Sequence, residues 1–464
     1  MRHHSPWTPH LAEGAQSPAE RLAEALGGDI LSGSLKVDDR LPAHRDLAWR
    51  LGIGVGSVTR AYAILERRGL VRSVHGRGTF VAARPDQASD QIDLATNMPP
   101  PMFSDRALAR TLNRLARTID PRLFNIYPPV AGHLEHRRIM ARWLAALGTE
   151  AEPERLLLTS GAQQALNVAL TVARPHVGYA VTEAQTYPGM LGVMRQAGLE
   201  IESVAMDAQG MLPASLEAVL TRRRHQRAVV YLTPTMQNPT SATMETARRQ
   251  DIARLCRRAD ALVIEDGVYV RERDPARPSL LDLAPERTFH VSSLSKILSP
   301  GLRIGVLIPP PRHAGACLPA LLASSLMIAP LSYAMMAQWM QDGTAESVRT
   351  SLHAEAIRRQ DLAVSILGEW MAAPTYHAFH AWLPMPAAQA EEMVGRARML
   401  GVSLPGPHTF SSGDAAARTA GGGTGVRLAL GSVTFRTLPE ALRRVRQACD
   451  LSQAKVSRDT IAIS

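Results

Sequence analysis

Residues 293–305 read Ser-Leu-Ser-Lys-Ile-Leu-Ser-Pro-Gly-Leu-Arg-Ile-Gly, and the fold of the chain is best inferred outward from this stretch. It contains Lys296, one of only three lysines among the 52 basic residues of the 464-residue chain. Arginine stays protonated at physiological pH, whereas lysine can act as a neutral amine. A mid-chain lysine among serines, a proline and glycines is therefore a candidate for amine chemistry.

Short apolar runs alternate with amphipathic helical patterns on the N-terminal side of this stretch. The predicted strands are residues 155–159, 179–182, 228–232, 261–265 and 288–291. The alternation predicts an α/β domain with a mostly parallel sheet and flanking helices. In such sheets ligands bind beyond the carboxyl ends of the strands. The candidate residues at those places are Ser160, Gly161, Ala162, Gln163, Tyr187, Asn238, Asp266, Tyr269, Ser293, Ser295 and Lys296.

Residues 1–84 have a different pattern and are predicted to form a separate domain. Ser17 as N-cap and Pro18 open a helix at 19–31, and further helices are expected at 43–52 and 57–69. Two β-prone runs, 70–74 and 79–81, are joined by the turn His-Gly-Arg-Gly. Three helices and a hairpin predict a winged helix-turn-helix domain. The polar residues 85–92 are predicted to be a linker, and residues 93–464 the second domain.

The composition, 45% hydrophobic and 20% charged, excludes collagen-like, coiled-coil and disordered chains. The three cysteines form no C-x-x-C pair, which excludes a disulfide framework and a zinc finger; no metal site is predicted. A cytoplasmic location is expected, since the N-terminus lacks the apolar segment of a secretory signal. Residues 314–341 carry no charge, but Pro319 and Pro330 favour buried helices, at a subunit interface, over a membrane span.

Segment 293–305 and the strand-end residues, in this order and spacing, resemble the fold-type-I pyridoxal-phosphate aminotransferases over nearly all of residues 93–450. The resemblance implies a smaller C-terminal subdomain and pyridoxal 5'-phosphate as cofactor, joined to Lys296 as an aldimine. The cofactor's phosphate would be held by Ser293, Ser295, Arg303 and the helix start at Ser160, Gly161, Ala162 and Gln163.

The same resemblance implies the remaining roles at this site. Asp266 would keep the pyridine ring protonated, since a carboxylate and a pyridinium about 4 Å apart attract by ~4 kcal/mol. Asn238 and Tyr269 would hydrogen-bond the phenolic oxygen, and Tyr187 would stack on the ring. Tyr127 would reach across a homodimer to the partner's phosphate. Arg427 would grip the α-carboxylate of an amino acid; an internal ion pair is the alternative.

Three motifs in residues 41–81 resemble the GntR-type DNA-binding domain: L-P-x-x-R-x-L-A, V-T-R-A-Y-x-x-L-E-x-x-G-L-V and G-R-G-T-F-V. By this resemblance, the helix at 57–69 enters the major groove of double-stranded DNA, and the turn arginine reaches the minor groove or a phosphate. The candidate DNA-binding residues are Arg45, Ser57, Thr59, Arg60 and Arg77. For the helical ones, a solvated helix face is the alternative.

A winged helix followed by an aminotransferase-like domain resembles the MocR-like regulators of the GntR superfamily. This resemblance implies a homodimeric transcription regulator that senses an amino acid or related amine through aldimine exchange at Lys296, without significant turnover. Two alternatives stay open: an active aminotransferase with an attached winged helix, and a regulator that senses pyridoxal phosphate itself.

Overall fold

The chain divides into two compact units, Met1–Asp90 and Gln91–Ser464. The computed structural model describes Trp7, Leu11 and residues 17–32, 34–36, 38–67, 70–74, 78–82, 91–102, 105–270, 274, 276–374, 377–412 and 423–461.

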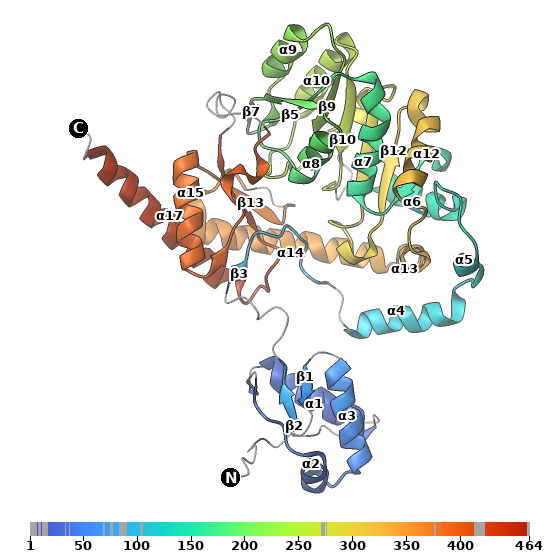
Figure 1. Ribbon diagram of the computed structural model, residues 1–464, viewed down its shortest axis with the longest axis vertical. Helices are drawn as coiled ribbons and strands as arrows, with labels where there is room; N and C mark the ends of the chain where they lie inside the picture. Colours follow the sequence, from blue (N-terminus) through green and yellow to red (C-terminus); the bar gives the residue numbers. More distant parts are fainter. Residues whose placement is uncertain are drawn as a thin grey trace. The chain divides into compact units, whose positions relative to one another are not determined.

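The first unit contains three helices and one hairpin (Figure 1): α1 (Pro18–Ser32), α2 (His44–Leu51), α3 (Val55–Arg67), β1 (Val71–Val74) and β2 (Gly78–Val81). Ser17 opens α1 with a reciprocal cap, because its hydroxyl accepts from the Glu20 amide and its own amide donates to the Glu20 carboxylate. Gly52 ends α2 in the left-handed conformation, at φ 64°. The third helix begins at Val55 rather than at Ser57, because the carbonyl of Gly54 already accepts from the Ser57 amide.

A seven-stranded sheet forms the centre of the second unit, in the order β4-β12-β11-β10-β9-β5-β6. The strands are β4 (Leu157–Thr159), β5 (Tyr179–Glu183), β6 (Glu200–Val204), β9 (Ala228–Leu232), β10 (Leu262–Asp266), β11 (Thr288–Ser293) and β12 (Gly305–Ile308). Only β12 runs antiparallel to its neighbours, β11 and β4. The predicted mostly parallel sheet is thus confirmed. The first strand is shorter than predicted because Pro153–Arg155 forms a 3-10 turn before it.

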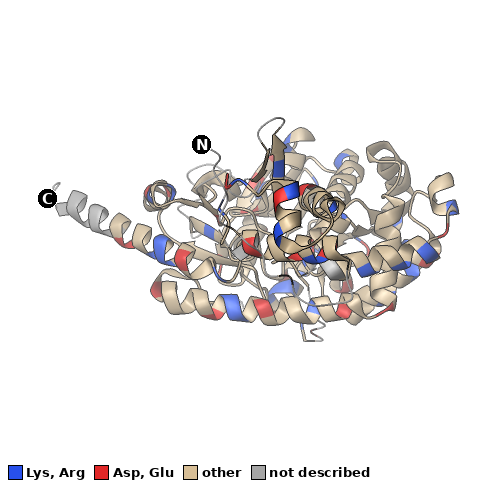
Figure 2. Cartoon of the chain, turned by 90° about the horizontal axis from the view of Figure 1, so that it is seen from below, with Lys and Arg blue, Asp and Glu red and all other residues tan. Residues whose placement is uncertain are grey.

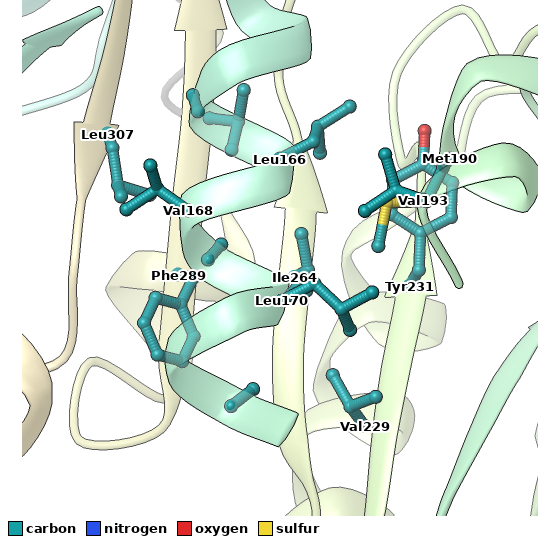
Figure 3. Packing of buried hydrophobic residues seen from close by; sticks show 14 of the residues in the cluster. Leu166, Val168, Leu170, Met190, Val193, Val229, Tyr231, Ile264, Phe289 and Leu307 are labelled. Atoms are coloured by element: carbon teal, nitrogen blue, oxygen red, sulfur yellow. The ribbon is translucent and has the colours of Figure 1, made fainter. Parts of the chain in front are cut away.

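Helices cover both faces of this sheet (Figure 1). One face is covered by α7 (Ala162–Ala173), α8 (Pro188–Gln196) and α12 (Ala314–Ser324), the other by α9 (Pro213–Arg222), α10 (Thr246–Arg258) and α11 (Leu280–Leu283). Successive strand residues point to opposite faces, so Val229 packs with α7 and Val230 with α10. Figure 3 shows Leu166 and Leu170 of α7 beside Ile264 and Val229 of the sheet. This double burial explains why the strands read as continuous apolar runs.

A smaller subdomain packs its own core at the C-terminal end of the unit. It contains the pairs β13 (His380–Pro384) with β15 (Gly425–Ala429) and β14 (Val402–Ser403) with β3 (Ile92–Asp93), and the helices α14 (Thr344–Leu367), α15 (Ala387–Met399) and α17 (Leu438–Ile461). The remaining elements are α4 (Asp105–Thr118), α5 (Arg122–Asn125), α6 (Leu134–Ala146), α13 (Pro330–Gln341) and the hairpin of β7 (Met206–Asp207) with β8 (Gly210–Met211). Strand β3 thus ties the start of this unit to its C-terminal part.

The uncharged stretch 314–341 forms α12 and α13. Within the single chain, the prediction of buried helices is right for part of α13, where Tyr333 and Trp339 are 2% exposed, whereas burial of the outer face of α12 at a subunit interface stays a prediction. Leu318 and Leu322 of α12 are 40% and 44% exposed, because one side of this helix packs against α7 and the other faces solvent. No helix among the described residues is long and apolar enough to cross a membrane.

Acidic and basic residues intermix along the outer helices (Figure 2). Many form pairs within one helix, such as Arg396 with Glu392 at 2.6 Å in α15 and Arg444 with Glu440 at 2.9 Å in α17. Exposed pairs of this kind contribute little to stability, ~0.3–0.5 kcal/mol each. Many of the arginines therefore lie on the outer helices in pairs of this kind.

Candidate functional site

Segment 293–305 is a loop that leaves the sheet and returns to it at the same edge. Ser293 ends β11 opposite Gly305, the first residue of the antiparallel β12. Both ends of the loop therefore lie where the parallel strands have their carboxyl ends, and Lys296 lies between them. A cavity of about 540 Å³ opens at this place. It is lined by eleven of the predicted residues, namely Ala162, Gln163, Tyr187, Asn238, Asp266, Tyr269, Ser293, Ser295, Lys296, Arg303 and Arg427.

Several hydrogen-bond donors line the cavity. The hydroxyl of Ser293 lies 3.0 Å from that of Ser295, which also belongs to the lysine loop. The guanidinium of Arg303 lies against Gly161, where an added Cβ would be 2.8 Å from Nη2. Gly161, at φ 86°, is the N-cap of α7, so the amides of the first helical turn have no acceptor within the helix. Hydroxyls, a guanidinium and a helix N-terminus together form a site for an anion such as a phosphate.

A carboxylate is buried in another part of the cavity wall. Asp266 ends β10 with 4% exposure, and its Oδ2 accepts a hydrogen bond of 2.8 Å from the hydroxyl of Tyr231. Burial raises the pKa of Asp266, and this hydrogen bond lowers it again in part. A buried carboxyl group that lines a cavity is favourably matched by a cationic ligand group.

Lys296 and Tyr269 both contact Asn97, a residue for which no role was predicted. The Nζ of Lys296 donates to the main-chain oxygen of Asn97, and Asn97 Nδ2 donates to the Tyr269 hydroxyl at 3.0 Å. Asn97 Nδ2 also lies 3.5 Å from Nδ1 of His380, a fully buried residue of β13. The polar groups beside the lysine thus come from three distant parts of the chain.

Arg427 lies in β15 and is 6% exposed. It donates to Oδ1 of Asn238 at 2.9 Å and to the main-chain oxygen of Ala95, and its guanidinium carbon lies 4.7 Å from the centre of the Phe410 ring. Burial lowers the pKa of Arg427, and its Nε has no hydrogen-bond partner among the described residues. The described hydrogen-bond partners of Arg427 are neutral, and the carboxylate of Asp93 acts on it electrostatically without a hydrogen bond to it among the described residues.

Three of the predicted cofactor residues lie outside the cavity wall. Ser160 and Gly161 precede α7 without lining the cavity, and the Ser160 amide donates to Gln164 Oε1 at 2.6 Å. Both residues lead into the helix start at Ala162, and their contact with a phosphate stays a prediction. Tyr127 is 79% exposed, so within one chain it does not contribute to the cavity.

Sequence reasoning missed three residues of the site: Asn97, Tyr231 and Phe410. Tyr231 could have been found, because a tyrosine inside an apolar strand needs a buried partner for its hydroxyl. Asn97 lies in an irregular segment and Phe410 ends the short 3-10 helix Pro407–Phe410, and neither segment has a readable pattern.

A second buried acid lies near this site. Glu183 ends β5, and its Oε2 accepts from Gln237 Nε2 at 3.0 Å. Burial raises the pKa of Glu183 to about 8. The folded protein therefore keeps this proton up to about pH 8, whereas the unfolded chain loses it near 4.5, so stability falls as pH rises between these values.

Glu183→Gln should remove this loss, because the amide has the shape of the protonated acid. The variant is expected to exceed the wild type in free energy of unfolding by a few kcal/mol at pH 8, with a smaller gain at pH 6. Urea unfolding followed by circular dichroism at the two pH values measures the difference. An equal gain at both pH values would contradict a protonated Glu183.

The predicted DNA-binding residues occupy α2 and α3 of the first unit. Arg45, Thr59 and Arg60 are exposed and Ser57 is half-buried. Thr59 Oγ1 lies 3.1 Å from His44 Nδ1, so the two helices of the motif are linked at this exposed face. Trp49 of α2 is 83% exposed. Arg77 lies outside the described residues.

The donor set of the large cavity fits pyridoxal 5'-phosphate. Ser293, Ser295, Arg303 and the start of α7 match a phosphate, Asp266 a pyridinium nitrogen and Lys296 an aldehyde. The volume also lies within the range of cofactor sites, roughly 300–1,000 Å³. A pyridoxal-phosphate site in an α/β unit, in one chain with a winged helix-turn-helix unit, defines the class of pyridoxal-phosphate-binding transcription regulators.

Comparison with known proteins identifies the family. Residues 89–394 match the family "Aminotransferase class I and II", and residues 18–81 match "Bacterial regulatory proteins, gntR family". The chain belongs to the aminotransferase class I and II family and carries a gntR-family DNA-binding domain. Pyridoxal phosphate is accordingly its cofactor.

Transcription regulators are among the relatives. The HTH-type transcriptional regulator TauR of Rhodobacter capsulatus is 29% identical, covering 94% of this chain and 98% of its own. The probable rhizopine catabolism regulatory protein MocR of Rhizobium meliloti is 28% identical over 66% of this chain and 68% of its own. The α-aminoadipate aminotransferase LysN of Thermus thermophilus has a similar fold, with a TM-score of 0.67 and 23% identity over 88% of this chain and 99% of its own. The predicted MocR-like architecture is confirmed.

Proposed function

We propose that this protein is a homodimeric transcription regulator whose DNA binding responds to an amino acid, or a related amine with a carboxylate, at Lys296. The observation that carries the proposal is the burial of Arg427 among neutral hydrogen-bond partners. The Arg427 side chain is a buried guanidinium in the wall of the cavity, and its described hydrogen-bond partners are the neutral groups of Asn238 and Ala95. A buried cation with no carboxylate among its described hydrogen-bond partners favours a ligand carboxylate at this place.

When bound, the cofactor would supply an electrophilic carbon that bonds exchangeably with primary amines, and Lys296 would be the amine of the protein that holds it. The protein groups hold the reactants in place. Ser293, Ser295 and Arg303 bind the anionic end, and Tyr231 orients Asp266 by its hydrogen bond. Arg427 fixes the effector through its carboxylate, so that the effector amine is brought to the lysine rather than left to diffuse.

The response of DNA binding requires a differential affinity of the effector for two arrangements of the protein. A coupling free energy of ~1–3 kcal/mol is sufficient, which corresponds to a 5- to 150-fold change in DNA affinity.

A homodimer is supported by the surface around Tyr127. Phe124 of α5 and Ile126, which follows that helix, are each 56% exposed, and Tyr127 is 79% exposed. Three adjacent exposed apolar side chains favour a protein interface. A second copy that covers this surface would bring Tyr127 to the partner's cofactor site.

Absorption spectroscopy of the cofactor-loaded protein with an amino-acid panel tests the proposal. A spectral change without turnover, together with altered DNA affinity, supports an effector-responsive regulator. Sustained turnover with an oxo-acid acceptor supports an active aminotransferase, which the filled catalytic positions favour as the second candidate. If pyridoxal phosphate alone changes the DNA affinity and no amino acid has an effect, the signal is the cofactor itself rather than an amino-acid effector.

Arg45→Ala is expected to weaken DNA binding similarly for all sequences, because Arg45 is an exposed arginine in the first turn of α2, where it can contact a phosphate. Each phosphate contact contributes about −0.9 to the slope of log K against log salt, so a dimer should lose roughly two units of slope. Fluorescence anisotropy with a labelled duplex at several salt concentrations measures this slope. Arg254→Ala, an exposed arginine of α10 in the other unit, is the matched control and should leave it unchanged.

A further inference from the structure

The segment Gln91–Met98, called here the strap, starts at the first residue of the second unit and ends in the cofactor site. Its first half is bound to the C-terminal subdomain, since β3 pairs with β14 and the Ala429 amide donates to the Leu94 oxygen at 2.8 Å. Its second half, Ala95 to Met98, lines the cavity. The strap is therefore the shortest covalent path from the site to the chain that leads into the DNA-binding unit.

Two main-chain oxygens of the strap are bound by the two residues that the effector must engage. Arg427 donates to the oxygen of Ala95, and Lys296 donates to the oxygen of Asn97. We infer that the position of the strap depends on these two hydrogen bonds, and that a change in them is transmitted along the chain to the DNA-binding unit. Asn97 is the positioning residue. This inference rests on the proposed function, because it needs a ligand that changes the state of Lys296.

The two contacts respond to an effector in opposite directions. A lysine nitrogen bonded to the cofactor has fewer hydrogens to donate than a free ammonium, which has three. Release of Lys296 therefore strengthens its contact with Asn97. A carboxylate at Arg427 competes for the N–H groups that hold Ala95, and a charged acceptor is preferred over a neutral one. The strap is thus bound more tightly at Asn97 and released at Ala95.

The side chain of Asn97 fixes the position of its oxygen and the direction of the neighbouring hydrogen bonds. Nε2 of His380 lies 3.0 Å from the main-chain oxygen of Gln237, so this nitrogen carries the hydrogen. The other nitrogen of a neutral His380 then accepts, and the Asn97 amide supplies hydrogens to both His380 and Tyr269. The Tyr269 oxygen accepts from Asn97, so the Asn97 side chain fixes the position of this hydroxyl in the cavity wall.

Hydrogen exchange tests the contact between Lys296 and Asn97. Methoxyamine releases the lysine from bound pyridoxal phosphate without a carboxylate, and aminooxyacetate does so with one. With methoxyamine, amide exchange in peptides covering residues 91–98 should slow about tenfold, since a hydrogen bond to a charged group contributes ~1.5–3 kcal/mol. With aminooxyacetate, the protection at residue 95 should be lower than with methoxyamine. Unchanged exchange in this segment, despite loss of the visible absorption band, would overturn the inference.

Substitution of Asn97 tests its positioning role. Asn97→Asp replaces two donors by acceptors, so the Tyr269 hydrogen is drawn to the new carboxylate and away from the cofactor. The pH midpoint of the visible band should rise by about one unit, which is the tenfold effect expected for one such hydrogen bond. Asn97→Ala should give a smaller rise. Asn167→Asp, the same change at an exposed position of α7, is the control and should leave the midpoint unchanged.

Measurements of DNA affinity test the regulatory part of the inference. The DNA is a duplex selected from random sequence by the cofactor-loaded wild type. Aminooxyacetate should change the wild-type affinity at least fivefold. It should change the affinity of Asn97→Asp and Asn97→Ala less than twofold, although both still bind cofactor and DNA. Wild-type responses in both variants would overturn the inference and leave the proposed function intact. If neither probe alters the spectrum of the wild type, the proposed function itself fails.

Discussion

Lys296→Ala is expected to abolish covalent attachment of pyridoxal phosphate and every response of the protein to amines. The lysine provides the only amine in the described cavity wall, between Ser295 and the carbonyl of Asn97. The anion site of Ser293, Ser295 and Arg303 remains, so the variant should still bind the cofactor non-covalently and more weakly. Mass spectrometry after borohydride reduction measures the outcome directly, because the wild type retains the mass of the cofactor and the variant does not.

Two further measurements make this result specific. Lys36→Ala, at an exposed position of the first unit, should behave as the wild type in reduction and mass spectrometry. DNA binding without effector should persist in Lys296→Ala, because the two units are separate compact bodies. Covalent retention of the cofactor by Lys296→Ala would show that another amine is used and would refute the site assignment.

The elements that depend on local sequence patterns were predicted best, namely the buried strands and the helix ends. Strands β5, β9, β10 and β11 were found because both of their faces are buried, which produces continuous apolar runs such as Ala228–Leu232. The ends of α1 and α2 were found because Ser17 and Gly52 have the side chain and the backbone freedom that helix ends require. Lys296 was singled out because a lone lysine in an arginine-rich chain is conspicuous.

What the sequence did not reveal depends on contacts between distant segments. Asn97 meets Tyr269, 172 residues away, and His380, 283 residues away, only through the packing of the C-terminal subdomain. The sequence also did not show which face of α12 is buried within the chain, since an uncharged helix has the same pattern whether it packs against its own chain or against a second copy. Residues at the cavity were found where the strand ends predicted them, and missed where an irregular segment supplied them.

Arg427→Met is expected to raise the effector concentration for half-maximal response about a hundredfold. Truncating one partner of a buried, hydrogen-bonded charge pair costs ~2–5 kcal/mol, and 1.4 kcal/mol corresponds to a factor of ten. Arg427→Lys keeps the charge and loses the planar fork, so its effect should be about tenfold. Titration of the visible band with an amino acid that is active on the wild type gives these concentrations.

Stability and ligand chemistry separate a binding role from a structural one. Replacement of Arg427 by methionine removes a buried cation but leaves the oxygens of Asn238 and Ala95 without this donor, so the free energy of unfolding should fall by no more than ~1–3 kcal/mol. Arg398→Met, at an exposed position of α15 in the same subdomain, is the matched control for both measurements. The decarboxylated form of the active amino acid should bind equally to the wild type and to Arg427→Met, because it has no group for the guanidinium to hold. If Arg427→Met weakened this amine as much as the amino acid itself, the carboxylate would not be what Arg427 recognises.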